Sequence, residues 1–397
     1  MKLLNARAFV LAFTSSLILA GVVQAQTFTL LYTFTDGSLP TGSLTLDGQG
    51  NLYGATGNGG AYGAGTVFKL DKLGNETVLY TFTGGADGAG PTGSLIWATQ
   101  NALYGTAYSG GASSIYCSNY GCGTVFEVDT GGNETVLYEF TGFQDGENPT
   151  SGLIEDAQGN LYGVAGQSLT TEPPVQYQEF GEIFKLYPSS GDGPDVLHNF
   201  LLFDGANPSG GLVQDAKGNF YGVTNGGGNV NEGVGYELSS TKGLIVLHNF
   251  TGPQTADGCL PLGTLAIDKS GNLYGATSRC GSANEGTVFK VGNTGKYTVL
   301  HNFVGGPSDG AIPSSGVIRD KAGNLYGETQ FGGTNGGANG GGTIYKLSTN
   351  GVLTVLYSFP AGSEPLGGLI RDAQGYLYGI TQGTSSPGYP TVWKLAP

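Results

Sequence analysis

The stretch GSLTLDGQGNLYG, residues 42–54, decides the fold, because near copies of it return along almost the whole chain. A repeat with a period of roughly 50 residues is typical of β-propeller blades. The repeat therefore has to be read before any single residue is given a role. The triplet Leu-Tyr-Gly that ends this stretch, or a close variant of it, begins at Leu52, Leu103, Leu161, Phe220, Leu273, Leu325 and Leu377.

Each unit contains four short segments in which apolar residues alternate with polar ones, bounded by Gly, Asp, Asn or Pro, which predicts strands. We call them strands A to D; in the first unit they are GSLTLD (42–47), NLYG (51–54), GTVFKL (65–70) and TVLYTF (77–82). Strands A, B and C occur seven times, but only six D strands follow a strand C. The segment TLLYTF (29–34) near the N-terminus supplies the seventh.

The strand count predicts an all-β fold, a seven-bladed β-propeller with four antiparallel strands per blade. The N-terminal strand would complete the last blade by pairing with the strand C that ends at Leu395. Closure of this kind removes exposed sheet edges. Residues 26–397 would then form a single domain. An open solenoid is the alternative, but it needs polar caps, and neither terminus offers one.

Residues 1–25 have the features of a secretory signal. Lys2 and Arg7 precede the apolar run AFVLAFTSSLILAGVV, and small residues surround Ala25, where we expect cleavage. A retained membrane anchor is the alternative, although the run is shorter than the ~20 residues that span a bilayer. We therefore predict a secreted protein, extracellular or periplasmic, with no stable membrane insertion.

The chain is acidic, with a formal net charge of −14, and loss of Lys2 and Arg7 with the signal makes it more so. Such a surface repels phosphate backbones, which excludes nucleic acid as the expected partner. The four cysteines fit an oxidising compartment. Cys117 and Cys122 share one loop, while Cys259 and Cys280 lie in loops on the same face of one blade, so we predict two local disulfides. A zinc site is the alternative, but blades two and five would have to converge for it.

The connections between strands A and B have the form D-x-x-G-N, for example from Asp47, which is a tight turn code. The B-to-C and D-to-A connections, on the opposite face, are longer and more variable. Because function tends to reside in loops that a rigid scaffold positions, we expect a ligand on this face. The candidate ligand-binding residues are Tyr62, Tyr116, Tyr120, Tyr177, Glu232, Glu285 and Phe331.

The D-to-A connections repeat a D-G-x-x-P motif, in which the aspartates read as turn formers. Calcium is the alternative reading, because hard cations take oxygen ligands, but no D-x-D-x-D-G run is present. No other cofactor is expected. The weak calcium candidates are Asp36, Asp87, Asp145, Asp204, Asp257 and Asp309.

The sequence contains no residue that is distinctive of catalysis. His198, His248 and His301, the three histidines, fill one slot of strand D that holds Tyr in other blades. A residue that recurs in three neighbouring blades is part of the packing, so no histidine is left for a Ser-His-Asp arrangement. A mechanism that uses only carboxylates, as in glycosidases, stays open.

The unit P-x-G-x-L-x-x-D-x-x-G-N-L-Y-G-x-T, followed by GG, G-T-V-F-K-L and V-L-Y-x-F, resembles the GloVer tandem repeat of secreted bacterial proteins, the "choice-of-anchor" family. Strands A and B are also similar to NHL and kelch-like blades. The GloVer resemblance implies a secreted or surface propeller of unassigned activity, often followed by an anchoring segment. Because this chain ends on a strand at Pro397, we expect release rather than attachment.

Two classes of function follow. The first is a non-catalytic binding module, a monomer that holds an extracellular glycan, peptide or other protein on its long-loop face. The second is an extracellular enzyme, a polysaccharide lyase or hydrolase with carboxylates and calcium at the channel mouth. One propeller fold hosts many functions. The lack of a unique histidine or of a non-repeating acidic cluster favours binding.

Overall fold

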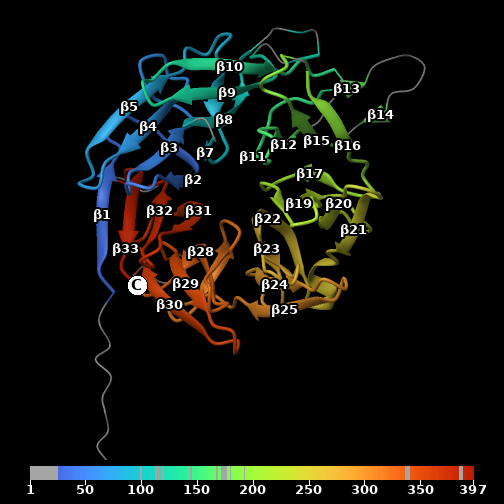
Figure 1. The fold of residues 1–397 in the computed structure, drawn as a ribbon. Coiled ribbons are helices and arrows are strands. Elements are labelled where there is room, and N and C mark those ends of the chain that lie inside the picture. The colour runs from blue at the N-terminus through green and yellow to red at the C-terminus, as the bar shows by residue number, and fades with distance from the viewer. Residues whose placement is uncertain are drawn as a thin grey trace, which may run out of the picture.

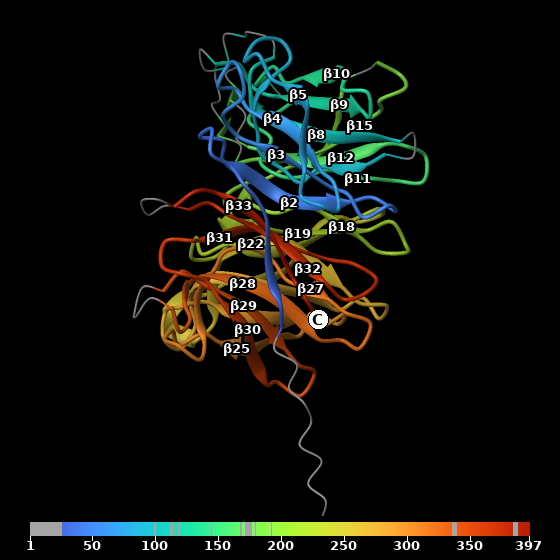
Figure 2. The ribbon, with the colours of Figure 1, turned by 90° about the vertical axis from the view of Figure 1, so that its left-hand side faces the viewer.

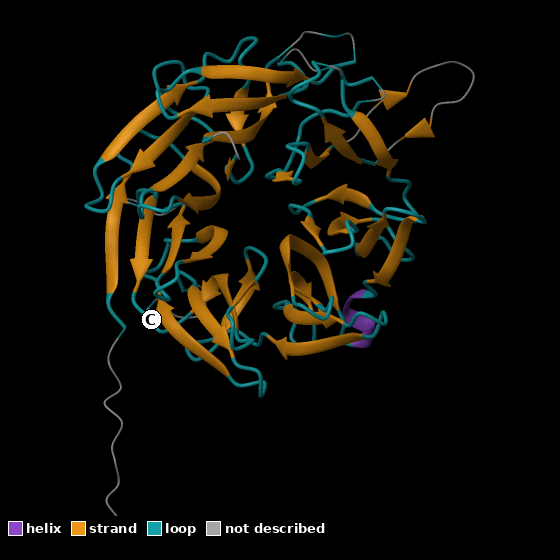
Figure 3. Ribbon diagram, in the orientation of Figure 1, coloured by secondary structure: helices purple, strands orange, loops and turns teal. Residues whose placement is uncertain are grey.

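The computed structural model describes residues 26–98, 101–111, 114, 116–117, 120–143, 145–166, 169–170, 177–178, 180–191, 193–335, 340–383 and 388–397. The signal predicted for residues 1–25 lies outside the described residues. In the described part, seven antiparallel sheets stand around a central axis (Figure 1). The all-β, seven-bladed propeller is therefore confirmed, and its one helix in that part is a short 3₁₀ turn, η1 (Gly252–Thr255) (Figure 3).

Each blade runs from an inner strand A to an outer strand D. Blade 1 contains β2 (Pro40–Leu46), β3 (Leu52–Thr56), β4 (Thr66–Leu70) and β5 (Glu76–Thr81). Blade 2 contains β6 (Ala89–Pro91) and β7 (Ile96–Trp97), then β8 (Ala102–Ser109), β9 (Thr124–Asp129) and β10 (Glu134–Glu139). Blade 3 contains β11 (Ile154–Glu155), β12 (Leu161–Ala165), β15 (Glu182–Leu186) and β16 (Asp195–Asn199), with a small hairpin, β13 (Leu169–Thr170) and β14 (Tyr177–Gln178), between β12 and β15.

Blades 4 to 6 follow the same plan. Blade 4 contains β17 (Ala206–Pro208), β18 (Val213–Gln214), β19 (Phe220–Gly226), β20 (Val234–Ser239) and β21 (Gly243–Asn249). Blade 5 contains β22 (Gly258–Ile267), β23 (Leu273–Cys280), β24 (Thr287–Val291) and β25 (Tyr297–Asn302). Blade 6 contains β26 (Gly310–Pro313), β27 (Ile318–Arg319), β28 (Leu325–Gly332), β29 (Thr343–Leu347) and β30 (Leu353–Ser358). In blades 2, 4 and 6 strand A is split into two short pieces, which both pair with strand B.

The last blade is built from both ends of the described chain. It contains β31 (Pro365–Arg371), β32 (Leu377–Thr381), β33 (Thr391–Leu395) and, as its outer strand, β1 (Phe28–Thr33). Strand β1 pairs antiparallel with β33, and Phe28 lies opposite Leu395 (Figure 2). The predicted closure of the ring by the N-terminal strand is therefore correct.

The glycine of Leu-Tyr-Gly is required by close packing on an aromatic ring. A Cβ atom on Gly54 would lie 2.6 Å from Cζ of Phe68, and one on Gly163 would lie 2.6 Å from Cζ of Phe184. These phenylalanines come from strand C of the same blade and are fully buried. A side chain at the glycine would therefore push the central ring out of its place.

Hydrophobic contacts between neighbouring blades make up the core. Phe126 of blade 2, for example, packs with Tyr53 and Val67 of blade 1. The same arrangement returns between blades 7 and 1, where Phe34 and Phe68 meet with ring centroids 5.3 Å apart. Each blade thus depends on its neighbours for burial, as expected for a repeat that cannot bury its apolar face alone.

Strands A meet at the axis with their backbones in contact. A Cβ atom on Gly93 would lie 2.3 Å from the amide nitrogen of Gly152, and one on Gly367 would lie 2.2 Å from the carbonyl oxygen of Gly42. The hollow between them has a volume of only about 160 Å³ and is lined mainly by Gly, Ser and Thr. Neighbouring blades are further tied by hydroxyl groups, for instance Thr41 Oγ1, which donates to the carbonyl of Pro91 at 2.7 Å.

Replacement of Phe34 by Ala should destabilise the protein by about 3 to 5 kcal/mol, because its side chain is 2% exposed at the junction that closes the ring. Leu30→Ala on the same strand is the matched control, since Leu30 is 54% exposed. Urea unfolding of both variants checks this. Equal losses of unfolding free energy, or none, would show that β1 does not complete the last blade.

Candidate functional site

The propeller has two faces with different character. The loop face carries the B-to-C and D-to-A connections, such as residues 57–65 and 82–88, and the hairpin face carries the A-to-B and C-to-D turns, such as residues 47–51 and 71–75. In the described part of the chain, both predicted disulfides lie on the loop face. Cys117 bonds Cys122 and Cys259 bonds Cys280, and no cysteine is free.

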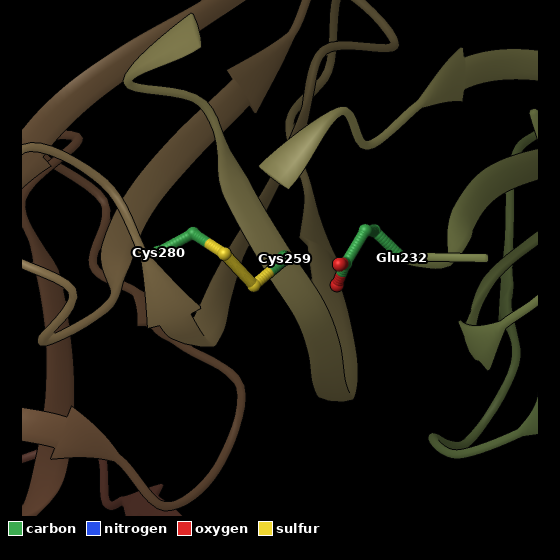
Figure 4. Close-up of side chains that lie close together, drawn as sticks. All are labelled: Glu232, Cys259 and Cys280. Carbon is green, nitrogen blue, oxygen red and sulfur yellow. A yellow bond between two sulfur atoms is a disulfide. The ribbon is translucent and has the colours of Figure 1, made fainter. Parts of the chain in front are cut away.

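The disulfide in blade 5 lies next to a carboxylate from blade 4. Glu232, Cys259 and Cys280 bring one oxygen and two sulfur atoms within 4.8 Å of one another (Figure 4). Both sulfur atoms are used in the disulfide, so they cannot act as the thiolate ligands that zinc requires. In this state the cluster does not form a metal site.

The predicted loop aromatics are spread around the ring rather than gathered. Tyr62 in blade 1 and Tyr120 in blade 2 are 66% and 79% exposed. Tyr116 stacks on Phe143, with ring centroids 4.8 Å apart, so its ring packs against a neighbouring loop of the same face. Phe331 is partly buried in β28. Tyr177 forms part of β14, and its side chain lies outside the described residues.

Glu232 and Glu285 have a backbone role that the sequence did not reveal. The carbonyl of Glu232 accepts the N–H of Leu260, and the carbonyl of Glu285 accepts the N–H of Ile312, at 3.0 and 2.9 Å. Each bond joins one blade to the next. Leu260 and Ile312 hold φ of 52° and 57° to make it, a conformation in which a β-branched residue is strained.

Ile312→Asn should stabilise the protein by roughly 1 kcal/mol, because Asn tolerates positive φ far better than Ile. Asn207 already occupies the equivalent position in blade 4, with φ of 52°. The reverse change, Asn207→Ile, is the matched control and should destabilise. Thermal unfolding of the two variants measures the effect. A lower midpoint for Ile312→Asn would mean that side-chain packing outweighs the strain.

The D-to-A aspartates are saturated with hydrogen bonds from their own loops. Asp145 accepts bonds from Tyr138 Oη, Thr141 N and Thr141 Oγ1 at 2.7 to 2.8 Å. In blades 3 to 5 the histidine of strand D replaces the tyrosine in this contact. The ring nitrogens of His198, His248 and His301 lie 3.2, 2.9 and 3.0 Å from Asp204, Asp257 and Asp309.

The aspartate contacts agree with the turn role that the sequence predicts, and the histidines are held at the outer strand. Asp36 and Asp87 are bound in the same way by Ser38 and Thr83. Calcium at these six aspartates stays a prediction. A cation would have to replace the turn bonds with its own.

Aspartate, tyrosine and lysine form a repeated unit on the hairpin face. In blade 1, Tyr53 donates to Asp47 at 3.2 Å, and Lys69 lies 5.6 Å from the centre of the Tyr53 ring. The hydrogen bonds of the turn outweigh desolvation and lower the pKa of Asp47. Asp47 therefore stays charged and is a poor proton donor. Equivalent units occur at Asp156, Tyr162 and Lys185, at Asp268, Tyr274 and Lys290, at Asp320, Tyr326 and Lys346, and at Asp372, Tyr378 and Lys394.

Hollows between blades open on the hairpin face. One, of about 650 Å³, lies between blades 3 and 4 and is lined by Tyr162, Lys185, Tyr187 and Phe220 among others. Two further hollows lie between blades 4 and 5 and between blades 1 and 2. The sequence directed attention to the opposite face, because it cannot show how far neighbouring blades stand apart.

Glu328 is a buried carboxyl group that the sequence reasoning missed. It is 0% exposed, its Oε2 lies 3.5 Å from Ser315 Oγ, and its Oε1 has no hydrogen-bond partner among the described residues. Burial raises the pKa of Glu328 to about 8. The sequence does distinguish Glu328, because it directly follows the Leu-Tyr-Gly triplet of blade 6. At this position the other blades have Ala55, Thr106, Val164, Val223, Ala276 and Ile380.

Because the pKa of Glu328 in the folded protein, about 8, lies above its ordinary value of 4.5, only the folded state keeps this proton between those values. Stability should therefore fall as pH rises from 4.5 to 8, by at most roughly 1.4 kcal/mol per pH unit. Glu328→Gln should flatten this slope, whereas Glu285→Gln, on the surface, should not. Urea unfolding from pH 5 to 9 measures it, and parallel slopes for all three proteins would contradict the assignment.

Comparisons with known proteins agree with the fold. Residues 114–265 and 254–397 match the model of the Gloeobacter/Verrucomicrobia repeat. No curated protein matches the chain in sequence. Among the described residues, none forms a helix long and apolar enough to cross a bilayer.

Solved structures show similar propellers at low sequence identity. The extracellular domain of BT4673 from B. thetaiotaomicron has a TM-score of 0.55 and 11% identity over 93% of this chain and 40% of that one. A puromycin-hydrolyzing peptidase of Mycobacterium tuberculosis has a TM-score of 0.52 and 13% identity over 89% of this chain and 51% of that one. A protein described as a gluconolactonase of a protein family has 11% identity over 94% of this chain and 92% of that one, with a lower TM-score of 0.46. These likenesses support the fold alone.

Proposed function

The chain belongs to the Gloeobacter/Verrucomicrobia repeat family, and we propose that it is a secreted, non-catalytic binding module whose loop face takes a cationic polypeptide. The observation that carries this proposal is the distribution of charged and apolar side chains between the two faces.

Charge is divided unequally between the faces. Apart from Arg279, every Lys and Arg in the described part of the chain lies in or next to a turn of the hairpin face. The other face, in its described loops, carries ten carboxylates and one positive side chain, Arg279 beside Cys280. Clefts and faces of one sign attract partners of the opposite sign and raise their association rate. The loop carboxylates are Asp36, Asp87, Asp145, Glu147, Asp204, Glu232, Asp257, Glu285, Asp309 and Glu364.

Exposed apolar side chains gather on the same face. Phe203 is 70% exposed, and Leu202 next to it is 47% exposed. The carbonyl of Leu202 accepts the N–H of Gly228, which brings this loop against the one that carries exposed Val230. Apolar surface of this kind marks a protein-binding site. Further exposed residues of the loop face are Leu39, Tyr62, Tyr120, Val304 and Tyr389.

A polypeptide suits this surface better than a metal ion. The loop aspartates already accept bonds from their own turns, so an ion would have to break those turns. A Lys or Arg side chain of a partner can bind without breaking those turns, because it is attracted by the charge of the carboxylates and can lie over the face of an exposed tyrosine. The apolar residues then supply contact area.

The carboxyl groups do not favour catalysis. Glycoside hydrolysis needs a carboxylic acid of raised pKa beside a second carboxylate at the substrate. Glu328 has a raised pKa, but it is buried and is not among the residues that line the hollows above. Asp156 and Asp215 line one hollow, but the pKa of each is lowered by bonds from its own turn that outweigh desolvation.

A fluorescein-labelled peptide of alternating Lys and Leu tests the proposal by fluorescence anisotropy with mature protein. We expect the triple variant Glu232→Gln, Glu285→Gln, Glu364→Gln to bind about tenfold more weakly, as loss of several steering charges predicts. The matched control removes the same charge from the hairpin face, by Glu127→Gln, Glu155→Gln and Glu237→Gln, and should change affinity less than about threefold.

Equal losses in the two triple variants would mean that only net charge acts, which overturns the assignment of the loop face. Tighter binding of a Glu-Leu peptide, or of Ca²⁺ alone, would overturn the class of partner. Release of products from a panel of polysaccharides, abolished by EDTA, would overturn the absence of catalysis.

A further inference from the structure

The hollow between blades 3 and 4 differs in its lining from the two other hollows described above on the hairpin face, because it is bordered by three aromatic side chains, against one and two in the others. We infer that it is a second binding site, separate from the loop face, and that its ligand is a neutral oligosaccharide. Its volume of about 650 Å³ is within the usual range for small-ligand sites, roughly 300 to 1,000 Å³.

Three aromatic side chains surround the hollow. Tyr162 and Phe220 lie with their ring centroids 4.4 Å apart and are each 7% exposed. Tyr187, on the C-to-D turn of blade 3, also lines the hollow. Its hydroxyl donates to Asp195 at 2.7 Å. Leu197 and Leu238 add apolar lining. Flat apolar surfaces with a fixed orientation suit the CH faces of a sugar ring.

Lys185 supplies a fixed hydrogen-bond donor. Its Nζ atom lies 5.5 Å from the centre of the Tyr162 ring and 4.5 Å from that of Tyr187. The only ion pairs within 4 Å among the described residues are the three His–Asp pairs, so no carboxylate of the described residues lies within 4 Å of this ammonium group. Burial lowers the pKa of Lys185, but its contacts with the two tyrosines outweigh that and raise it.

One position in this hollow holds a different kind of side chain in other blades. The last residues of strand A project toward the tyrosine of the preceding blade. Trp97 packs on Tyr53, with centroids 4.8 Å apart, and Arg371 lies 5.7 Å from the centre of the Tyr326 ring. In blade 4 the same position is Gln214, which is exposed and lines the hollow, so a longer side chain there would take up part of its volume.

The charge of the lining favours a neutral sugar over an acidic one. Asp156 and Asp215 flank the hollow, and both keep their charge because the turn bonds lower the pKa of each. One ammonium between two carboxylates leaves no net positive charge to attract a uronic acid. Sugar hydroxyls, in contrast, can accept from Lys185 and donate to carboxylate oxygens.

The test is isothermal titration calorimetry of the mature protein with cellohexaose, xylohexaose, mannohexaose and oligogalacturonate. We expect at least one neutral hexasaccharide to bind and oligogalacturonate to bind at least tenfold more weakly. Tyr187→Ala and Gln214→Arg should each weaken the neutral ligand at least tenfold, the first by loss of the stacking surface and the second by covering it.

A matched control comes from blade 6, where Arg371 lies over Tyr326, the ring equivalent to Tyr162. Lys346→Met should leave binding unchanged, whereas Lys185→Met should weaken it. Near-ultraviolet circular dichroism of each variant establishes that the fold is kept. Binding of none of the sugars, or binding that Gln214→Arg does not weaken, would overturn the site, and tighter binding of oligogalacturonate would overturn the ligand class. None of these results depends on the Lys-Leu peptide.

Discussion

The contact between the glycine of Leu-Tyr-Gly and the aromatic ring of strand C is the constraint on which the rest of the propeller depends. With no Cβ atom at Gly54, the ring of Phe68 fits against the backbone of strand B. The ring then reaches the neighbouring blade, where Phe34 packs on it. One missing methyl group per blade thus determines both the packing within a blade and the spacing between blades.

Variation in the same contact separates the blades chemically. Tyr236, Tyr345 and Trp393 replace the phenylalanine in blades 4, 6 and 7, and each is fully buried. Glu328 lies close to Trp393, since a Cβ atom on Gly379 would lie 2.9 Å from Glu328 Oε1 and 2.4 Å from Trp393 Cζ2. Ring hydroxyl and indole groups therefore enter the core at this position in blades 4, 6 and 7, while blades 1, 2, 3 and 5 keep phenylalanine.

The fold could be predicted from the sequence almost completely, because every strand is written seven times. The pairing of β1 with β33 and both disulfides followed from counting strands and faces. The candidate sites were harder. Glu232 and Glu285 were selected as side chains, but their carbonyls make the inter-blade bonds. Gln214 lines the hollow between blades 3 and 4, and the sequence did not show that a space lies beside it.

The last blade has a consequence for the order in which the protein folds. Strand β1 is synthesised before every other strand of the propeller, and its partner β33 is synthesised after all of them. No local pairing can satisfy β1 in the meantime, and contacts between residues so far apart in sequence form slowly. Until Thr391–Leu395 are synthesised, β1 presents an unpaired apolar strand, the kind of segment that makes incomplete chains prone to aggregate. A chaperone that shields β1 during synthesis would protect the one strand whose partner comes last.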